Sequence, residues 1–310
     1  MAVPTMGAAP SNTYIETAAV GVREDLADII YRIDPDETPL VSACPRVGSK
    51  QVLTEWIVQE LNPAADNAQP EGFTAVMQAV LKPIRINNVC QILARTVGVS
   101  NTLRVVDVVG GEDEYNRNMI LRAMEVKRDL ELAVTSPLVR TITDPRHMSG
   151  LPCYTAFGAR GAGAGVMPIG DGSNAGTPGT AYDLTLAVVN AAIQQCWQAG
   201  GNPTLGIMSG NIKNYFATLS QGGTGNPIVA QNIVQASPTG EMTIQGAVDV
   251  YRTNFGTLQL TPDRFGPAHQ ILLVSTDYVE MAPLPERDMV QQDSRRIAAN
   301  DNAIRSLVAA

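Results

Sequence analysis

Aromatic and charged side chains are scarce in this sequence. Phe, Trp and Tyr make up 5% of the 310 residues, and Asp, Glu, Lys and Arg make up 17%. Apolar residues nevertheless reach 45%, which excludes a wholly disordered chain and allows one large or two ordinary domains. No apolar run approaches the roughly 20 residues that span a bilayer, and residues 1–10 lack the basic and apolar regions of a signal peptide. We therefore expect neither a membrane span nor a cleaved leader.

Cysteine and histidine are too few and too scattered to suggest a metal site or a catalytic site. The four cysteines form no Cys-x-x-Cys pair, and neither histidine has metal-ligand spacing to the other or to a cysteine. We predict no catalytic, cofactor-binding or metal-ligating residue and no cofactor, although a Cys–His pair that meets only in the fold stays open. The residues concerned are Cys44, Cys90, Cys153, Cys196, His147 and His269.

The net charge of −8 makes specific binding of nucleic acid unexpected, because phosphate repels an acidic chain. Residues 150–240 contain only four charged side chains, at Arg160, Asp171, Asp183 and Lys213. Either much of this surface is covered in an assembly, or Ser, Thr, Asn and Gln solvate it.

A glycine-rich stretch, Gly158–Gly165, could suggest a nucleotide-binding loop. Such a loop lies between a strand and the start of a helix, so that backbone N–H groups point at the phosphates. The stretch is instead followed by more Gly and Pro in Val166–Gly172, and no Gly-Lys-Ser/Thr is present. A surface loop is therefore favoured. A nucleotide-binding enzyme that uses Gly158–Gly165 is the less favoured alternative, and we expect the chain not to be an enzyme.

Two segments predict a pair of antiparallel strands. Gln51–Glu60 and Ile84–Leu93 alternate apolar and polar residues and are rich in β-branched side chains. The 23 residues between them, Leu61–Pro83, contain several turn-forming pairs and no regular pattern. A loop of this length is unusual in a compact domain. Either one strand is wrongly predicted, or the segment is a projecting arm whose apolar side is covered by a neighbouring molecule.

Residues 112–135 predict one long helix of roughly 36 Å. Acidic residues lie at its N-terminal end, and Ser136-Pro137 ends it. Two pairs of opposite charge, Asp113–Arg117 and Lys127–Glu131, have i,i+4 spacing. Apolar residues recur at steps of four and three at Met119, Ala123, Val126, Leu130 and Ala133.

The remaining chain mixes helices and strands, so the predicted class is α+β. A helix is expected over Leu184–Gln198, with Asp183 as N-cap, Gly200 as C-cap and an apolar stripe at Leu186, Val189, Ile193 and Trp197. A strand over Thr204–Met208 and a helix through Ile212, Tyr215, Phe216 and Leu219 follow. Further strands are expected at 247–251, 256–260, 269–274 and 278–281, with a turn at Pro262-Asp263, and residues 286–310 favour a helix or irregular chain.

Several short phrases occur in a characteristic order. They are Glu37-Thr-Pro-Leu40, Thr54-Glu-Trp56, Asn67-Ala-Gln-Pro-Glu-Gly72, Val97-Gly-Val-Ser-Asn-Thr102, Lys127-Arg-Asp-Leu-Glu131, Ala199-Gly-Gly-Asn-Pro203, Val248-Asp-Val-Tyr251 and Asn254-Phe-Gly-Thr257. In this order and spacing, the sequence from about Glu37 to Arg305 resembles the tailed-bacteriophage major capsid (major head) proteins with the Hong Kong 97 phage fold.

The resemblance implies a division of the chain into five parts. Residues 1–45 would form an N-terminal arm, and 46–96 an extended β-hairpin loop that lies over the neighbouring subunit. Residues 97–182 would form the peripheral domain, with the helix at 112–135 as its spine. Residues 183–282 would form the axial domain, and 283–310 would return to the peripheral domain.

The resemblance also implies a function. The chain would self-assemble as pentamers and hexamers into the icosahedral shell that encloses the phage genome, in the virion capsid, after assembly in the host cytoplasm. Implied partners are further copies of the chain, scaffolding, portal and decoration proteins, and double-stranded DNA through weak, non-specific contact; no membrane partner is implied. An encapsulin-like compartment with an enzyme cargo has the same fold and is the alternative.

Overall fold

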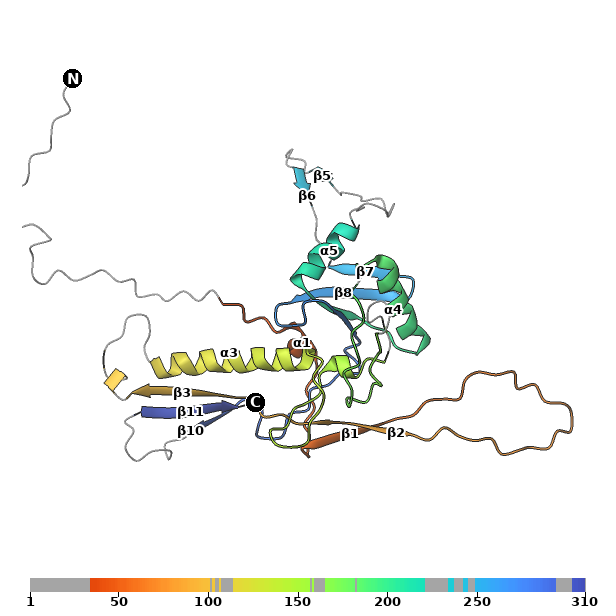
Figure 1. Ribbon diagram of the computed structural model, residues 1–310, viewed down its shortest axis with the longest axis horizontal. Helices are drawn as coiled ribbons and strands as arrows, with labels where there is room; N and C mark the ends of the chain where they lie inside the picture. Colours follow the sequence, from red (N-terminus) through yellow and green to blue (C-terminus); the bar gives the residue numbers. More distant parts are fainter. Residues whose placement is uncertain are drawn as a thin grey trace, which may run out of the picture.

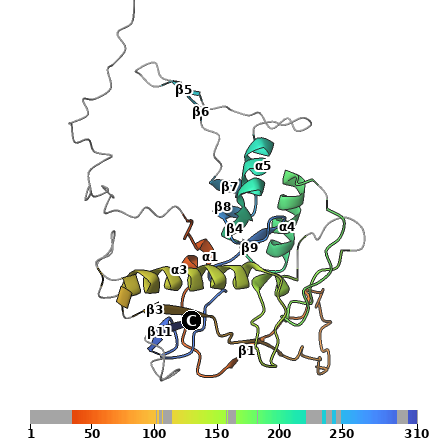
Figure 2. The same cartoon turned by 60° about the vertical axis from the view of Figure 1, so that its left-hand side comes forward.

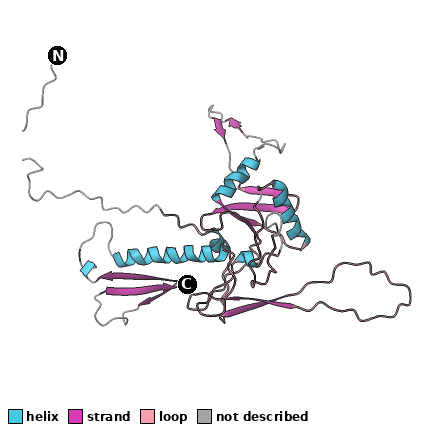
Figure 3. Cartoon of the chain, viewed as in Figure 1, coloured by secondary structure: helices cyan, strands magenta, loops and turns pink. Residues whose placement is uncertain are grey.

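The computed structural model describes residues 34–100, 102–103, 106, 114–156, 158, 165–181, 183–220, 234–236, 242–244, 249–293 and 303–309. Most of the expected N-terminal arm and of the Gly158–Gly165 loop lies outside these residues. Three parts are visible in Figure 1: a mixed sheet with two covering helices, a long helix beside a small sheet, and a narrow ribbon that extends away from both. Figure 3 shows the mixture of helices and strands that the α+β prediction requires.

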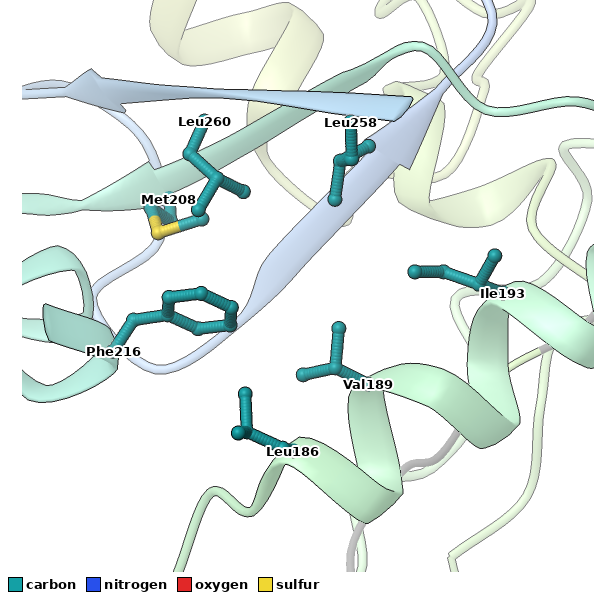
Figure 4. Close-up of a cluster of buried hydrophobic side chains, with 7 residues drawn as sticks. All are labelled: Leu186, Val189, Ile193, Met208, Phe216, Leu258 and Leu260. Atoms are coloured by element: carbon teal, nitrogen blue, oxygen red, sulfur yellow. The ribbon is translucent and has the colours of Figure 1, made fainter. Parts of the chain in front are cut away.

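The first part is a four-stranded sheet with the strand order β7-β8-β4-β9. Strands β4 and β8 are parallel, and the other two pairings are antiparallel. Two helices, α4 and α5, cover one face, and the apolar side chains between them and the sheet form the main core (Figure 4). The bounds are α4 Leu186–Gln198, β4 Leu205–Ser209, α5 Gly210–Ser220, β7 Val250–Thr253, β8 Gly256–Asp263 and β9 Ile271–Val274.

The other face of this sheet packs against the short helix α1 (Pro39–Ala43). Leu205 and Ile207 of β4 form a second apolar cluster with Leu40 and Cys44. The first four residues of β4 are therefore all buried, because successive side chains point into two different cores. The N-terminal segment is thereby tied to the middle of the sheet.

The second part is the long helix α3 (Glu114–Thr135), which lies along a three-stranded sheet of order β10-β11-β3 (Figure 2). The bounds of the strands are β3 Ala94–Ser100, β10 Val290–Asp293 and β11 Ala303–Ala309. Val97 and Val99 of β3 are buried, as is Val126 of α3, and Arg95 donates two hydrogen bonds to Asp129. The C-terminal strand β11 thus pairs with a strand some 200 residues earlier.

Most predicted elements are confirmed, with small shifts at their ends. Helix α4 begins later than predicted, and its N-cap is Thr185 rather than Asp183: Val188 donates its backbone N–H to the Thr185 hydroxyl at 3.3 Å. Gly200 follows the C-cap residue Ala199 with φ +88°, a conformation that favours glycine. The predicted apolar stripe is buried except for Trp197, which is 56% exposed and contacts the ring of Phe255.

Three predictions in the C-terminal part are wrong. Pro262-Asp263 is not a turn, because β8 continues through both residues beside β4. Gln259 donates its N–H toward β4, to Thr204, whereas Leu260 donates to the opposite side, to Asp249. By the same alternation the nitrogen of Pro262 faces away from β4, so the pairing of β8 with β4 loses no hydrogen bond at the proline. Residues 278–281 form only an isolated bridge, Arg46 to Met281. Residues 290–293 and 303–309 are strands rather than helix or irregular chain.

The remaining described elements are short. A 3-10 turn, η2, covers Leu151–Cys153, and the strands β5 (Val234–Ala236) and β6 (Met242–Ile244) pair with each other. Among the described helices, none is both long and apolar enough to cross a membrane.

Candidate assembly surface

The third part of the fold is a two-stranded ribbon. Strands β1 (Leu53–Val58) and β2 (Ile84–Val89) pair antiparallel from Leu53 opposite Val89 to Val58 opposite Ile84. Both predicted strands are therefore confirmed, and the interpretation in which one of them was wrong is excluded. The chain between them extends far from the rest of the molecule (Figure 1).

The distal part of the ribbon, residues 59–83, is exposed along its whole length. The described residues leave its apolar side chains largely uncovered: Val76 is 81% exposed and Met77 is fully exposed. Leu61, Phe73 and Val80 are exposed too. An exposed apolar surface of this kind marks a site where another molecule binds. We call residues 59–83 the distal loop.

The distal loop has a defined turn at its tip. Phe73 donates its N–H to the carbonyl of Pro70, and Gly72 between them has φ +76°. Further back, Asn62 donates to the carbonyl of Ala79 across the loop. The two limbs therefore stay roughly in register without a continuous ladder of backbone bonds.

The root of the ribbon is attached to the body by polar contacts. The side-chain amide of Asn88 makes two bonds to the backbone of Ser149: it accepts from the N–H at 2.9 Å and donates to the carbonyl at 3.2 Å. The next residue, Gly150, is buried, and a Cβ atom there would lie 1.9 Å from the carbonyl oxygen of Ser136. The segment at Ser149 and Gly150 thus packs directly against the end of α3.

Gly150→Ala is expected to destabilise the subunit by about 1–3 kcal/mol, because the added methyl group collides with backbone rather than with a movable side chain. Denaturant unfolding of the unassembled subunit measures the change. Gly48→Ala is the matched control, since nothing lies within 4 Å of its new methyl group. Equal stability of the two variants would contradict the packing described for Gly150.

A buried carboxylate links α3 to the N-terminal segment. Glu131 has no exposed surface, and its two oxygens accept the backbone N–H groups of Leu40 and Val41, each at 2.8 Å. These are unpaired N–H groups of the first turn of α1, so Glu131 caps that helix from a distance. The predicted ion pair between Lys127 and Glu131 is wrong, because Lys127 is exposed while Glu131 points inward. Of the other predicted pair, Asp113 lies outside the described residues, and Arg117 pairs with Glu114.

Burial raises the pKa of Glu131 above its ordinary value of 4.5, and the nearby charge of Asp263 raises it further. The folded state therefore binds this proton at a higher pH than the unfolded state does. The contribution of Glu131 to stability is thus largest below about pH 4.5 and is lost as pH rises through the raised pKa. Measured against Glu131→Gln, which cannot titrate, wild-type stability should increase as the pH falls from neutral toward 4.5. A difference that is constant with pH, or that shrinks on acidification, would contradict this.

The sequence of the whole chain has a recognisable match. A profile of the SU10 major capsid protein matches residues 9–305. The chain belongs to the SU10 major capsid protein family. The resemblance found in the sequence is therefore confirmed. The "Major capsid protein" of Escherichia phage Phieco32 is 32% identical over 123 residues, which are 39% of this chain and 35% of that protein. The match to that curated relative thus spans about a third of its length.

The fold of this capsid protein also matches solved structures. A chain of the cyanophage A-1(L) capsid asymmetric unit has a TM-score of 0.61 at 14% identity, covering 84% of this chain and 76% of that one. A chain from Mycobacterium phage Bobi has a TM-score of 0.58 at 15% identity, covering 93% and 87%. At these identities the likeness concerns the fold, and the predicted phage capsid fold of the α+β class is confirmed.

The structure bears on two of the chemistries considered for this capsid protein, thiol reactivity and metal binding. None of the four cysteines forms a disulfide, and burial raises the pKa of Cys44, Cys90 and Cys196, which disfavours the reactive thiolate. Within the described residues, no group of three or more His, Cys, Asp or Glu side chains could hold a metal ion. Gly158 follows a 3-10 turn, and Val166 bridges to Thr177, so the flanks of the glycine-rich stretch lack the strand and helix of a phosphate loop.

The sequence analysis did not find the two residues that attach helix α1 and the ribbon to the body of the capsid protein, Glu131 and Asn88. Glu131 lies about 140° around α3 from the predicted apolar stripe at Val126, where an exposed charge is the normal expectation. Asn88 lies within a predicted strand, and nothing in the sequence distinguishes it from any other polar residue of that strand. The signal available for Glu131 was its position between Leu130 and Leu132 in an otherwise apolar turn.

Proposed function

We propose that this chain assembles with copies of itself, as pentamers and hexamers, into the icosahedral shell that encloses a tailed-phage genome. The observation that carries the proposal is the distal loop, whose apolar side chains project into solvent from an isolated subunit. Burying one side chain such as Val76 or Met77 against a second copy is worth about 1.5–3 kcal/mol. Contacts of this size, repeated around a ring and between rings, suffice to close a shell.

The same proposal assigns roles to the parts of the chain. Residues 1–45 serve as an arm, and 46–96 as the loop that lies over the neighbouring subunit. Residues 97–182 form the peripheral domain, 183–282 the axial domain around the five- and six-fold axes, and 283–310 return to the peripheral domain. The pairing of β11 with β3, beside α3, supports the last assignment.

Further partners follow from the shell. The net charge of −8 suits a shell that encloses packaged DNA and binds it only weakly. Scaffolding and portal proteins would act during assembly in the host cytoplasm. A decoration protein would bind outside; a similar fold occurs in the structure of Phage G major capsid and decoration proteins, at a TM-score of 0.53 and 13% identity, covering 96% of this chain and 91% of that one. We propose no enzymatic activity for the chain.

Electron microscopy of the purified full chain, expressed with and without its scaffolding protein, tests the proposal. Closed icosahedral particles or capsomers are expected. A stable monomer that never assembles under either condition would overturn it. The contents separate the two shell functions: particles formed during infection should hold double-stranded DNA, whereas an enzyme cargo would indicate an encapsulin-like compartment.

A further inference from the structure

The direction in which the ribbon leaves the body is set at one backbone atom. The carbonyl oxygen of Asn87, in β2, accepts hydrogen bonds from the guanidinium of Arg140 and from the hydroxyl of Tyr154, both at 3.0 Å. The same Arg140 nitrogen also donates to the carbonyl of Asp171 at 2.9 Å. Two segments of the body, around 140 and 171, are thus joined to the ribbon through one side chain.

The second donor to this carbonyl, Tyr154, is itself held in place. Its ring lies so close to Gly172 that a Cβ atom there would come within 2.5 Å of the hydroxyl oxygen, and Gly172 has φ +77°. Its ring also contacts that of Trp56, in β1, at 5.7 Å between centroids. Burial raises the pKa of Tyr154 to about 12, so the hydroxyl remains a hydrogen-bond donor at any physiological pH. Tyr154 therefore contacts both strands of the ribbon at its root.

Further bonds at and just after β2 complete the attachment. The Asn88–Ser149 pair described above follows directly after Asn87, and the side chain of Gln91, two residues beyond the end of β2, accepts the N–H of Met148 at 3.2 Å. Bonds at three points along this segment restrain rotation about its axis and bending away from the body. The bonds at Asn87 go to the backbone carbonyl, so they hold the strand itself rather than a rotatable side chain.

Because the ribbon is long, a small rotation at its root displaces its tip by a large distance. Fully extended, the 15 residues from Gly72 to Asn87 span about 50 Å, so a rotation of about 10° at the root would displace the tip by about 9 Å. That displacement exceeds the width of one side-chain contact. The ribbon can meet a fixed position on a second copy only if its root is rigid.

We infer that Arg140 and Tyr154 are positioning residues, which fix the direction of the ribbon and thereby the place on a second copy that the distal loop reaches. The inference rests on the proposed shell function, but the orientation of the ribbon can be measured without assembly. Removing both donors frees the Asn87 carbonyl and leaves the β1–β2 ladder intact.

Spin labels on the unassembled full-length subunit test the inference. One label at Lys82→Cys lies just before the start of β2, and the other at Gln194→Cys lies on the exposed face of α4, in a background of Cys90→Ala and Cys196→Ala. In Arg140→Gln/Tyr154→Phe, we expect the pulsed-EPR distance distribution to widen at least twofold. Tyr154→Phe alone keeps the ring and should widen the distance distribution less than the double variant does. The matched control, Arg252→Gln/Tyr215→Phe, changes exposed side chains of the same types and should leave the width unchanged.

Particle diameters provide the second measurement. With the midpoint of thermal unfolding within a few degrees of wild type, the double variant should give particles of mixed diameter or open sheets, and the control should give particles like those of wild type. An unchanged distance distribution in both Tyr154→Phe and the double variant would overturn the inference even where wild type assembles. Failure of wild type itself to assemble would overturn the proposed shell function, while the distance measurement still decides the role of Arg140 and Tyr154.

Discussion

Replacing the distal loop by a tight turn is expected to abolish shell formation while leaving the subunit folded. Val58 pairs with Ile84, so residues 59–83 can be replaced by Asn-Gly, which closes a two-residue hairpin at that position. The removed residues are all exposed, and no buried apolar contact of the subunit is lost. Each shell contact, however, loses several apolar side chains, at about 1.5–3 kcal/mol each. We expect no particles by electron microscopy and an unfolding midpoint close to that of wild type.

A single substitution gives a finer form of this test. Met77→Lys places a charge at a fully exposed apolar position, which costs nothing in the free subunit but must be desolvated when a second copy covers it. Particle yield should fall at least tenfold at a fixed protein concentration. Gln78→Lys adds the same charge one residue away, at a position that is already polar, and should assemble much better. Equal yields from the two variants would show that the apolar side of the loop is not what the neighbour covers.

Glu131→Ala is expected to destabilise the subunit by about 2–4 kcal/mol. The substitution leaves the N–H groups of Leu40 and Val41 buried without an acceptor, at about 1–3 kcal/mol each. Relief from burying the carboxylate offsets part of this loss. Because α1 also packs on β4, the loss should loosen the contact between the N-terminal segment and the sheet. Denaturant unfolding gives the size of the effect, and hydrogen exchange at Leu40 and Val41 gives its location.

Glu125→Ala is the control for that change. Glu125 is on the same helix, but it forms only partly exposed ion pairs, with Arg122 and with Arg95. Each such pair stabilises the fold by about 0.2–1 kcal/mol. We expect little loss of stability and no change in exchange at α1. If Glu131→Ala were as mild as Glu125→Ala, the carboxylate would not be holding the N-terminal segment.

Local patterns were sufficient to predict most of the elements. Alternation predicted β1 and β2, the steps of four and three predicted α3, and the apolar stripe of α4 proved buried at three of its four positions. These features depend on neighbours within one helix or strand. The ordered phrases, in addition, identified the capsid family that the profile match establishes.

Contacts between distant segments could not be predicted in this way. Strand β3 is recognisable only through its pairing with β11, and the inward direction of Glu131 depends on α1, about 90 residues earlier. Helix α3 contacts β3 through Asp129 and α1 through Glu131, so one apolar stripe could not describe all of its neighbours. A neighbouring molecule was expected to cover the apolar side of the projecting arm, but Trp56 in β1 contacts the ring of Tyr154 in the same subunit while remaining 41% exposed.

Oxidation of Met77 before and after assembly tests the central claim most directly. In the free subunit Met77 is fully exposed, whereas Met208 is buried in the sheet core and reports on intact folding in both states. Because a thioether must be accessible to be oxidised by peroxide, we expect Met77 to react at least tenfold more slowly in closed particles than in separated monomers. If Met77 reacted equally fast in both states while Met208 stayed protected, the distal loop would not be covered by a second copy.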